Sequence, residues 1–333
     1  MIECIFSIDY EIYGNGEGLL DELVYEPARK LKNIFDQSGV KIVVFVETAE
    51  LEKIETFGTD PAISKVKGQI KEFYEQGHEI ALHIHPQWCN ARYLDGKWEL
   101  DYSEYNLCEL PKERIVEIVN RSITYIRTVL EESDFTPLSF RAGNWLFQPT
   151  QPLAGILAEQ GIKVDSSVFK GGLQHQHKLD YRSTFSNGYY WSFTKSVVVP
   201  DPKGKMLEIP IHTQMVPFWK MLTTKRIGLQ YKGLSEIQFG TSKLYRLLDF
   251  TRVRQPLKFD FCRLTLDELI SMVDTIIRED RKTPTLFRPV VAIGHTKDLV
   301  DLATVDSFLS YLSQKEIAVS TFRNIPQIQM LNG

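Results

Sequence analysis

Two pairs of side chains have the types and the spacing that metal binding and proton transfer require. Asp9 and Glu11 are separated by one residue after an apolar run, and His83 and His85 have the same spacing before Pro86. In an extended strand, residues i and i+2 point to the same side. Two carboxylates can divide the roles of base and metal ligand, while two imidazoles with one carboxylate leave a coordination position for water, as in catalytic zinc sites.

Three further polar residues follow apolar runs later in the chain. Arg141 could hold a carboxylate in its ionised form through paired hydrogen bonds. Asp165 could accept a hydrogen bond from His295, which would fix the tautomer of that imidazole and suit it to proton donation. Each residue taken alone also has an ordinary structural explanation, such as a salt bridge or a solvated loop carboxylate. Their recurrence after apolar runs favours a shared site.

The elements that must position these side chains alternate along the whole sequence. Runs rich in β-branched residues predict strands at 3–7, 41–46, 79–83, 138–140, 163–166, 207–211, 290–294 and 318–321. Amphipathic patterns predict helices at 26–37, 63–76, 112–132, 151–160, 265–278 and 304–314. This alternation predicts an α/β protein with a parallel sheet, doubly wound or closed as a barrel, in a single domain covering 1–333. The polar residues then lie at the carboxyl ends of strands, where sites form in such proteins.

Two insertions interrupt the alternation, one aromatic and irregular near 86–110 and one near 217–260. The segment 220–263 carries ten basic residues against three acidic ones, although the formal net charge of the chain is −4. The basic residues are Lys220, Lys225, Arg226, Lys232, Lys243, Arg246, Arg252, Arg254, Lys258 and Arg263; the acidic ones are Glu236, Asp249 and Asp260. A solvated helical face and a surface for an anionic partner both explain this bias.

Bulk composition is that of a globular protein with a sizeable core, at 43% hydrophobic and 25% charged residues. The net charge gives no overall attraction to nucleic acid, and no apolar run has the length of a membrane span. The first residues lack the pattern of a signal peptide, and the four cysteines are widely spaced. We therefore expect a cytoplasmic protein with reduced thiols.

Taken in order, the motifs resemble those of the NodB-type polysaccharide deacetylases, carbohydrate esterase family 4, over Ser7 to about His295. The resemblance implies a distorted (β/α)7 barrel with parallel strands. It implies Asp9 as catalytic base, Arg141 as the residue that orients it, His295 as catalytic acid, Asp165 as the partner of that acid, and Glu11, His83 and His85 as metal ligands. The sequence departs from the family pattern where Tyr10 separates the two carboxylates. It departs again where Gln87 occupies the position expected for the second histidine.

The function implied by the resemblance is metal-dependent removal of an acyl group, chiefly acetyl, from an N-acylated sugar or a surface-polysaccharide precursor. Zn²⁺ is the first choice of metal, and Co²⁺, Ni²⁺ or Fe²⁺ would also suit a histidine and carboxylate set. A cytoplasmic location favours a nucleotide- or lipid-linked precursor, and the basic 220–263 segment would suit its charge.

Three alternatives stay open. The chain could be an amidase acting on a small non-sugar amide, a non-catalytic carbohydrate-binding protein with a degenerate metal site, or a scaffold that binds phosphate or nucleic acid through the basic segment. Aromatic residues at 88–105 and 189–191 could stack on sugar rings or pack within loops. His175 and His177 form a second pair beside Gly171 and Gly172, and we do not favour it as a metal site.

Overall fold

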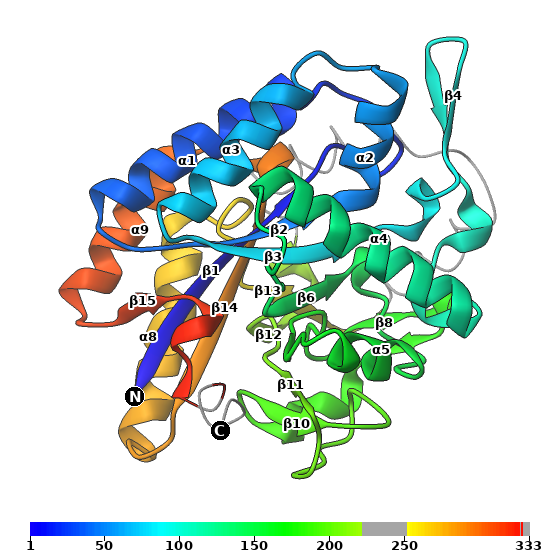
Figure 1. Cartoon of the computed structure of the whole chain (residues 1–333). Helices are drawn as coiled ribbons and strands as arrows, with labels where there is room; N and C mark the ends of the chain where they lie inside the picture. The colour runs from blue at the N-terminus through cyan, green and yellow to red at the C-terminus, as the bar shows by residue number, and fades with distance from the viewer. Residues whose placement is uncertain (222–251, 327, 329–333) are drawn as a thin grey trace.

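The computed structural model describes residues 1–221, 252–326 and 328. Its centre is a sheet of parallel strands that runs through the whole chain (Figure 1). In spatial order the parallel strands are β11 (Met206–Glu208), β7 (Val164–Asp165), β6 (Ser139–Ala142), β3 (Glu79–Ile84), β2 (Val43–Glu47), β1 (Ile2–Tyr10) and β14 (Arg288–His295). The short strand β15 (Ala318–Ser320) pairs with the first half of β1, and β10 (Trp191–Phe193) pairs antiparallel with β11.

The two ends of this sheet meet, so the sheet curls into a barrel. Ile211, three residues beyond β11, forms a parallel bridge with Val291 of β14, and the amide of His212 donates to the Val291 carbonyl at 3.0 Å. Every residue of β2, β3 and β6 is buried, as expected for parallel strands covered on both faces. The predicted α/β class and distorted parallel barrel are confirmed.

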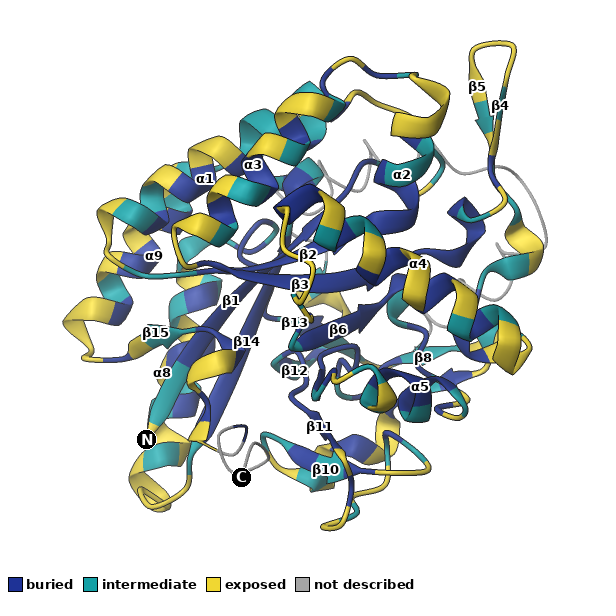
Figure 2. Ribbon diagram, in the orientation of Figure 1, coloured by how far each residue is buried: buried dark blue, intermediate teal, exposed yellow. Residues whose placement is uncertain are grey.

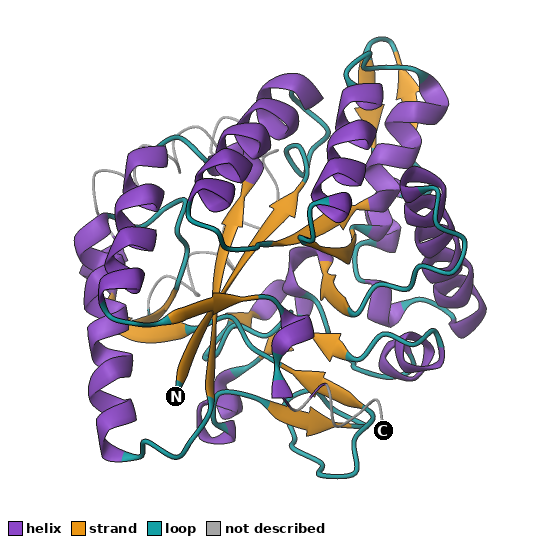
Figure 3. Ribbon diagram, turned by 60° about the vertical axis from the view of Figure 1, so that its left-hand side comes forward, coloured by secondary structure: helices purple, strands orange, loops and turns teal. Residues whose placement is uncertain are grey.

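Helices cover the outside of the barrel (Figures 1 and 3). They are α1 (Glu26–Gln37), α2 (Thr48–Phe57), α3 (Ile63–Glu75), α4 (Lys112–Leu130), α5 (Leu153–Glu159), α8 (Leu266–Lys282) and α9 (Leu302–Gln314). Each presents a buried stripe to the sheet and exposed residues to solvent (Figure 2). A capping box between Thr265 and Glu268 starts α8, which explains why the predicted helix begins there.

The eight predicted strands and six predicted helices are all present, with ends shifted by a few residues. The prediction omitted α2, because it follows β2 with no intervening loop. Glu47, the last residue of β2, is also the N-cap residue of α2, and its side chain accepts a hydrogen bond from the Glu50 amide. No turn residue marked that boundary.

The first predicted insertion lies wholly within the described residues, and the second lies within them only at its two ends. Residues 86–110 form short turns and a hairpin of β4 (Arg92–Leu94) and β5 (Lys97–Glu99), which projects from the body of the molecule (Figure 1). Both hairpin turn residues, Asp95 and Gly96, have positive φ, as an Asp-Gly hairpin requires. The second insertion is entered by β12 (Thr213–Pro217) and left by β13 (Arg254–Lys258), which pair antiparallel.

Half of the basic residues predicted to form a charged surface lie outside the described part of the chain. These are Lys225, Arg226, Lys232, Lys243 and Arg246. A second short hairpin, β8 (Leu173–Gln174) with β9 (Leu179–Asp180), carries His175 and His177 in its connection. All four cysteines are free. Buried hydrophobic side chains from Cys4 to Ile328 belong to one cluster, while the single-domain expectation stays a prediction.

No helix in the described ranges combines the length and the apolar character that crossing a lipid bilayer demands.

Candidate metal centre and active site

The predicted site residues lie at the carboxyl ends of neighbouring parallel strands. Asp9 of β1 is the register partner of His295 at the end of β14, and His83 of β3 is the register partner of Arg141 in β6. Glu11 lies two residues after Asp9, and His85 lies two residues after His83, so the members of each pair point to the same side of an extended backbone. Strand order and pleat therefore bring together side chains that are far apart in the sequence.

Glu11, His83 and His85 converge on one point. The Nε2 atom of His85 lies 3.0 Å from Glu11 Oε2, and the Nε2 atom of His83 lies 3.4 Å from the same oxygen. All three residues are buried, and one ligand atom from each lies within 4.8 Å of the others. Asp9, Glu11 and His295 form a second group that meets the same distance criterion.

The hydrogen bonds behind the two histidines suit metal ligation. His83 Nδ1 lies 2.8 Å from the carbonyl oxygen of Arg141, so Nδ1 carries the proton and the Nε2 lone pair is free. His85 Nδ1 lies 3.2 Å from the amide nitrogen of Gln87 and 3.3 Å from that of Asn144. Among the described residues, the buried Gln87 oxygen has no hydrogen-bond partner. Half-turns of both side-chain amides would bring oxygens to Nδ1 and free the Nε2 lone pair of His85 as well. The donor set therefore fits a divalent cation.

Lys297 stabilises the ionised form of the Glu11 carboxylate. Its Nζ lies 2.8 Å from Glu11 Oε1 and donates also to the carbonyl of Ile12 at 2.9 Å. Burial alone would raise the pKa of Glu11, but the Lys297 ammonium and the two histidines hold that pKa well below its usual range. Glu11 is therefore a carboxylate at neutral pH, the form that binds metal.

Asp9 is held by a fully buried arginine. Arg141 Nη1 lies 2.6 Å from Asp9 Oδ1, and its Nη2 and Nε bond to Ser7 Oγ and the Ser166 carbonyl at 2.9 and 3.0 Å. The guanidinium also stacks on Phe45, 3.9 Å from the ring centroid. Burial would raise the pKa of Asp9, but the Arg141 guanidinium acts together with His83 and His295 to outweigh it, and the pKa is lowered. The predicted pairing of Arg141 with this carboxylate is present.

His295 lies against two carboxylates. Its Nε2 is 3.4 Å from Asp9 Oδ2, and its Nδ1 is 3.6 Å from Asp298 Oδ2 and makes no hydrogen bond among the described residues. Burial lowers the pKa of His295 to about 4, although both carboxylates oppose the shift. The neutral imidazole is therefore the resting form at neutral pH.

The predicted pairing of Asp165 with His295 is wrong. Asp165 accepts hydrogen bonds from the side chain and the amide of Ser167 at 2.7 and 3.2 Å, and its register partner is Glu208 of β11. Burial raises the pKa of both carboxyl groups of this pair. The reason is strand order: β7 lies beyond β6, while β14 lies beside β1, so the acidic neighbours of His295 come from β1 and from its own following turn.

Comparison of the sequence with protein-family models and with curated proteins gives no match. Solved structures do match along almost the whole chain. A protein from Mycobacterium smegmatis assigned as a polysaccharide deacetylase has 15% sequence identity and a TM-score of 0.53, over 99% of this chain and 90% of its own.

The chain has the polysaccharide deacetylase fold.

Structures with other activities share this polysaccharide deacetylase fold. An allantoinase matches with 13% identity and a TM-score of 0.51, over 99% of this chain and 89% of its own. A GH57 branching enzyme from Thermococcus kodakaraensis matches with 12% identity and a TM-score of 0.54, over 97% of this chain and 70% of its own. At these identities the comparisons establish the fold, and the activity must be argued from the site.

Several residues of the site in this deacetylase fold were missed by sequence reasoning. Lys297 and Asp298 lie two and three residues after His295, and their position next to a motif was the available signal. Glu47 and Glu50 are buried carboxyls that accept hydrogen bonds from the amides of His85 and Ile12, at 3.1 and 2.9 Å. Burial raises the pKa of Glu50 to about 8. Both carboxyls fix the backbone beside candidate metal ligands.

The other histidine pair and the aromatic segments lie elsewhere in the deacetylase fold. Neither candidate metal group among the described residues includes His175 or His177. Trp88 is buried and packs against Trp98, with ring centroids 5.0 Å apart, so it belongs to loop packing. Tyr189 lines a separate cavity.

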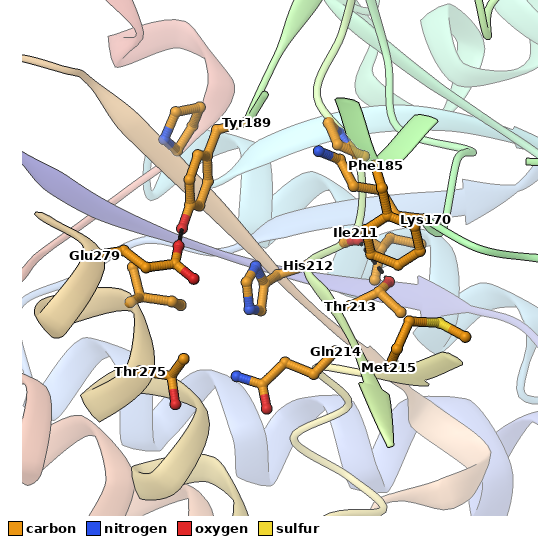
Figure 4. A pocket seen from close by; sticks show the side chains of 13 residues that line it. Lys170, Phe185, Tyr189, Ile211, His212, Thr213, Gln214, Met215, Thr275 and Glu279 are labelled. Atoms are coloured by element: carbon orange, nitrogen blue, oxygen red, sulfur yellow. Dashed lines mark hydrogen bonds between the residues drawn. The ribbon is translucent and has the colours of Figure 1, made fainter. Parts of the chain in front are cut away.

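That cavity has a volume of about 490 Å³ and lies between α8 and the start of β12 (Figure 4). Tyr189 donates a hydrogen bond to Glu279 of α8 at 2.7 Å, and His212 points into the same space. Its lining includes none of the candidate metal ligands, Asp9 or His295. The cavity is therefore distinct from the candidate active site.

Proposed function

We propose that this protein is a metal-dependent hydrolase that removes an acyl group, chiefly acetyl, from an N-acylated sugar or a surface-polysaccharide precursor. The observation that carries the proposal is the convergence of His83 and His85 on one Glu11 oxygen, at 3.4 and 3.0 Å, beside the Asp9–Arg141 pair and His295. This arrangement joins a cation site, a carboxylate held ionised and an imidazole within one buried group.

Glu11, His83 and His85 are the residues that would hold the cation, with Zn²⁺ the first choice and Co²⁺, Ni²⁺ or Fe²⁺ compatible. A divalent cation there would supply Lewis acidity, which polarises an acyl carbonyl and lowers the pKa of water. Lys297 contributes by keeping Glu11 ionised.

Asp9 is the proposed general base. Its Oδ1 atom is bonded to Arg141, which keeps the carboxylate ionised and fixes its rotamer, so Oδ2 is the oxygen that takes the proton from the attacking water. Arg141 is a positioning residue, because it acts through Asp9. The conservative change Arg141→Lys would not reproduce its several directed hydrogen bonds.

His295 is the proposed general acid. Because the neutral imidazole is its resting form, it must receive a proton during turnover, and Asp9 Oδ2 at 3.4 Å is the donor. The proton removed from water then passes through Asp9 and His295 to the amine nitrogen as its bond to the acyl carbon breaks. The products are a carboxylic acid and an amine, which exchange a proton to give a carboxylate and an ammonium ion.

One alternative activity has an observation in its favour. The allantoinase neighbour acts on a non-sugar amide on a similar barrel, so a small cyclic or linear amide is the competing substrate class. The same donor set and the same proton path serve either substrate. A lipid-linked precursor and a cytoplasmic location stay predictions.

The decisive experiment measures bound metal and acetate release together. We expect about one zinc per chain in the wild type after incubation with zinc, and loss of both metal and activity in His83→Ala and His85→Ala. His177→Ala is the matched control, because it removes a histidine from the other His-x-His pair, and it should keep both. The substrates are N-acetylglucosamine, its short oligomers and allantoin.

Each outcome of that experiment has a separate meaning. A folded wild type that binds none of zinc, cobalt, nickel or iron would overturn the metal site and with it the mechanism. Metal binding with hydrolysis of allantoin alone would replace the sugar substrate by a small amide.

A further inference from the structure

Lys258, the last residue of β13, places its ammonium group against the aromatic wall of the candidate site. Its Nζ lies 4.0 Å from the centroid of the Trp145 ring and 4.7 Å from that of Phe169. The residue as a whole is only partly buried. Contacts of this kind are cation–π interactions.

The same aromatic wall borders the proposed proton-transfer residues. The Trp145 ring centroid lies 6.0 Å from that of His295, and the Arg141 guanidinium carbon lies 5.9 Å from the Trp145 ring. Asp9 and Arg141 both act electrostatically on the Lys258 ammonium. Lys258 is therefore a neighbour of the position where an N-acyl group would react.

Lys258 differs from the other cations of the site because no described residue accepts a hydrogen bond from its ammonium group. Arg141 is paired with Asp9, Lys297 with Glu11, and Arg263 with Asp298. Within the part of the chain that the structure describes, Lys258 Nζ has no hydrogen bond and no ion pair. The nearby Asp260 instead accepts from the amides of Cys262 and Arg263, at 3.0 and 3.1 Å.

An ammonium group without a protein acceptor can donate to an anionic ligand without first breaking a hydrogen bond within the protein. Burial, together with the Arg263 guanidinium, lowers the pKa of Lys258 to about 8, so the charged form still predominates at pH 7. Asp9 and Glu11 are already paired with Arg141 and Lys297, so the Lys258 ammonium adds a positive charge that these carboxylates do not neutralise. It offers three donors to an anionic oxygen.

We propose that Lys258 is a specificity-determining residue that binds an anionic group, a carboxylate or a phosphate, carried by the sugar whose N-acyl group is hydrolysed. The proposal rests on the proposed function, because it names the substrate class of that same site. The Trp145 and Phe169 faces orient the ammonium group, and the anion is bound on the side that the rings leave open.

Calorimetry of sugar binding to the zinc-loaded full chain tests this proposal independently of turnover. The probes are neutral N-acetylglucosamine, its 1-phosphate and 6-phosphate, and N-acetylmuramic acid, which carries a carboxylate. We expect the wild type to bind at least one anionic probe roughly 10- to 100-fold more tightly than the neutral sugar. The probe that binds most tightly distinguishes carboxylate from phosphate.

The variants separate charge from structure. Lys258→Met keeps an unbranched chain against the rings and should lose the preference for the anionic probe, with the affinity for N-acetylglucosamine within about threefold of wild type. Lys258→Arg should retain most of the preference. Arg254→Gln is the matched control, because it removes an exposed charge from the same strand and should change neither affinity.

Two results would overturn the proposal: a wild type that binds no anionic probe more tightly than the neutral sugar, or an unchanged preference in Lys258→Met. Acetate release from the same probes is measured in parallel. Preferential binding without acetate release from any probe would contradict the proposed function while supporting the anion site, so the two failures are distinguishable.

Discussion

Arg141 links the two halves of the candidate site through different parts of one residue. Its carbonyl oxygen accepts the Nδ1 proton of His83, and its guanidinium binds Asp9. The backbone thus orients a candidate metal ligand, and the side chain fixes the candidate base. Because both contacts are fully buried, a shift of β6 would move both groups together.

Asp298 provides the first prediction at the scale of the residue. It is the carboxylate that faces His295 Nδ1, so Asp298→Asn should lower kcat roughly 10- to 100-fold while bound metal stays near one per chain. Asp165→Asn is the comparison. It should lower the unfolding free energy, while its kcat should fall less than that of Asp298→Asn. Steady-state kinetics and denaturant unfolding of both variants measure this. A larger loss of kcat in Asp165→Asn than in Asp298→Asn would restore Asp165 as the partner of the acid.

Residues of the site could be predicted where a local rule applies. Alternation along a strand predicted that Asp9 and Glu11 share a face, and the same rule paired His83 with His85. Asp298 lies in the turn that follows His295, whereas no local rule relates Lys258 to the site, because its place depends on which strands are neighbours. The Asp165 error has the same cause.

Among the elements, the turn at Gly143–Trp145 is tightly constrained. A Cβ atom on Gly143 would lie 2.5 Å from the Ile84 carbonyl oxygen and 2.9 Å from the His85 ring. Asn144 and Trp145 both have positive φ, at 55° and 66°, which costs free energy for residues with side chains. The turn is therefore packed directly onto a candidate metal ligand.

Gly143→Ala should destabilise the protein by about 1–3 kcal/mol and weaken zinc binding, because His85 must move to admit the methyl group. Gly68→Ala is the matched control, since Gly68 is exposed within α3 and has nothing within 4 Å of its added Cβ atom. It should stabilise the protein by about 0.5–1 kcal/mol without changing zinc affinity. Urea unfolding and metal titration test both; equal zinc affinity in the two variants would contradict the prediction.

Elements with a strong periodic pattern were predictable, and those defined by tertiary contacts were not. The helix at 112–130 could be predicted from the spacing of Ile115, Val119 and Ile123, which are all buried on one side. The two-residue strand β7 has no pattern of its own and exists because β6 and β11 flank it. Tertiary pairing decides such short strands.

For the whole molecule, one contribution to the pH dependence of stability can be predicted from His78. Its Nδ1 accepts a hydrogen bond from the Ile42 amide at 3.2 Å, and burial lowers its pKa to about 4. The unfolded chain, with an ordinary histidine pKa near 6.5, takes up a proton first as the pH falls. The contribution is therefore full above about pH 6.5 and is lost as the pH falls toward 4.

His78→Gln should reduce the loss of unfolding free energy between pH 7 and pH 5 by on the order of 1–2 kcal/mol. Metal-free protein is used, so that metal release does not add to the effect. Exposed His175 supplies the control, His175→Gln, which should leave the loss as in the wild type. Identical pH dependence in all three proteins would show that His78 does not titrate with folding.

The pairing of β1 with strands from the far end of the sequence has a consequence for synthesis on the ribosome. The strand that carries Asp9 precedes every other described strand, whereas its partners β14 and β15 are made much later, 286 residues later for His295. At ordinary translation rates this delay is roughly 15 to 60 seconds. For that time the nascent chain presents an open strand edge and no assembled centre, so cotranslational chaperone binding should concentrate on its amino-terminal third.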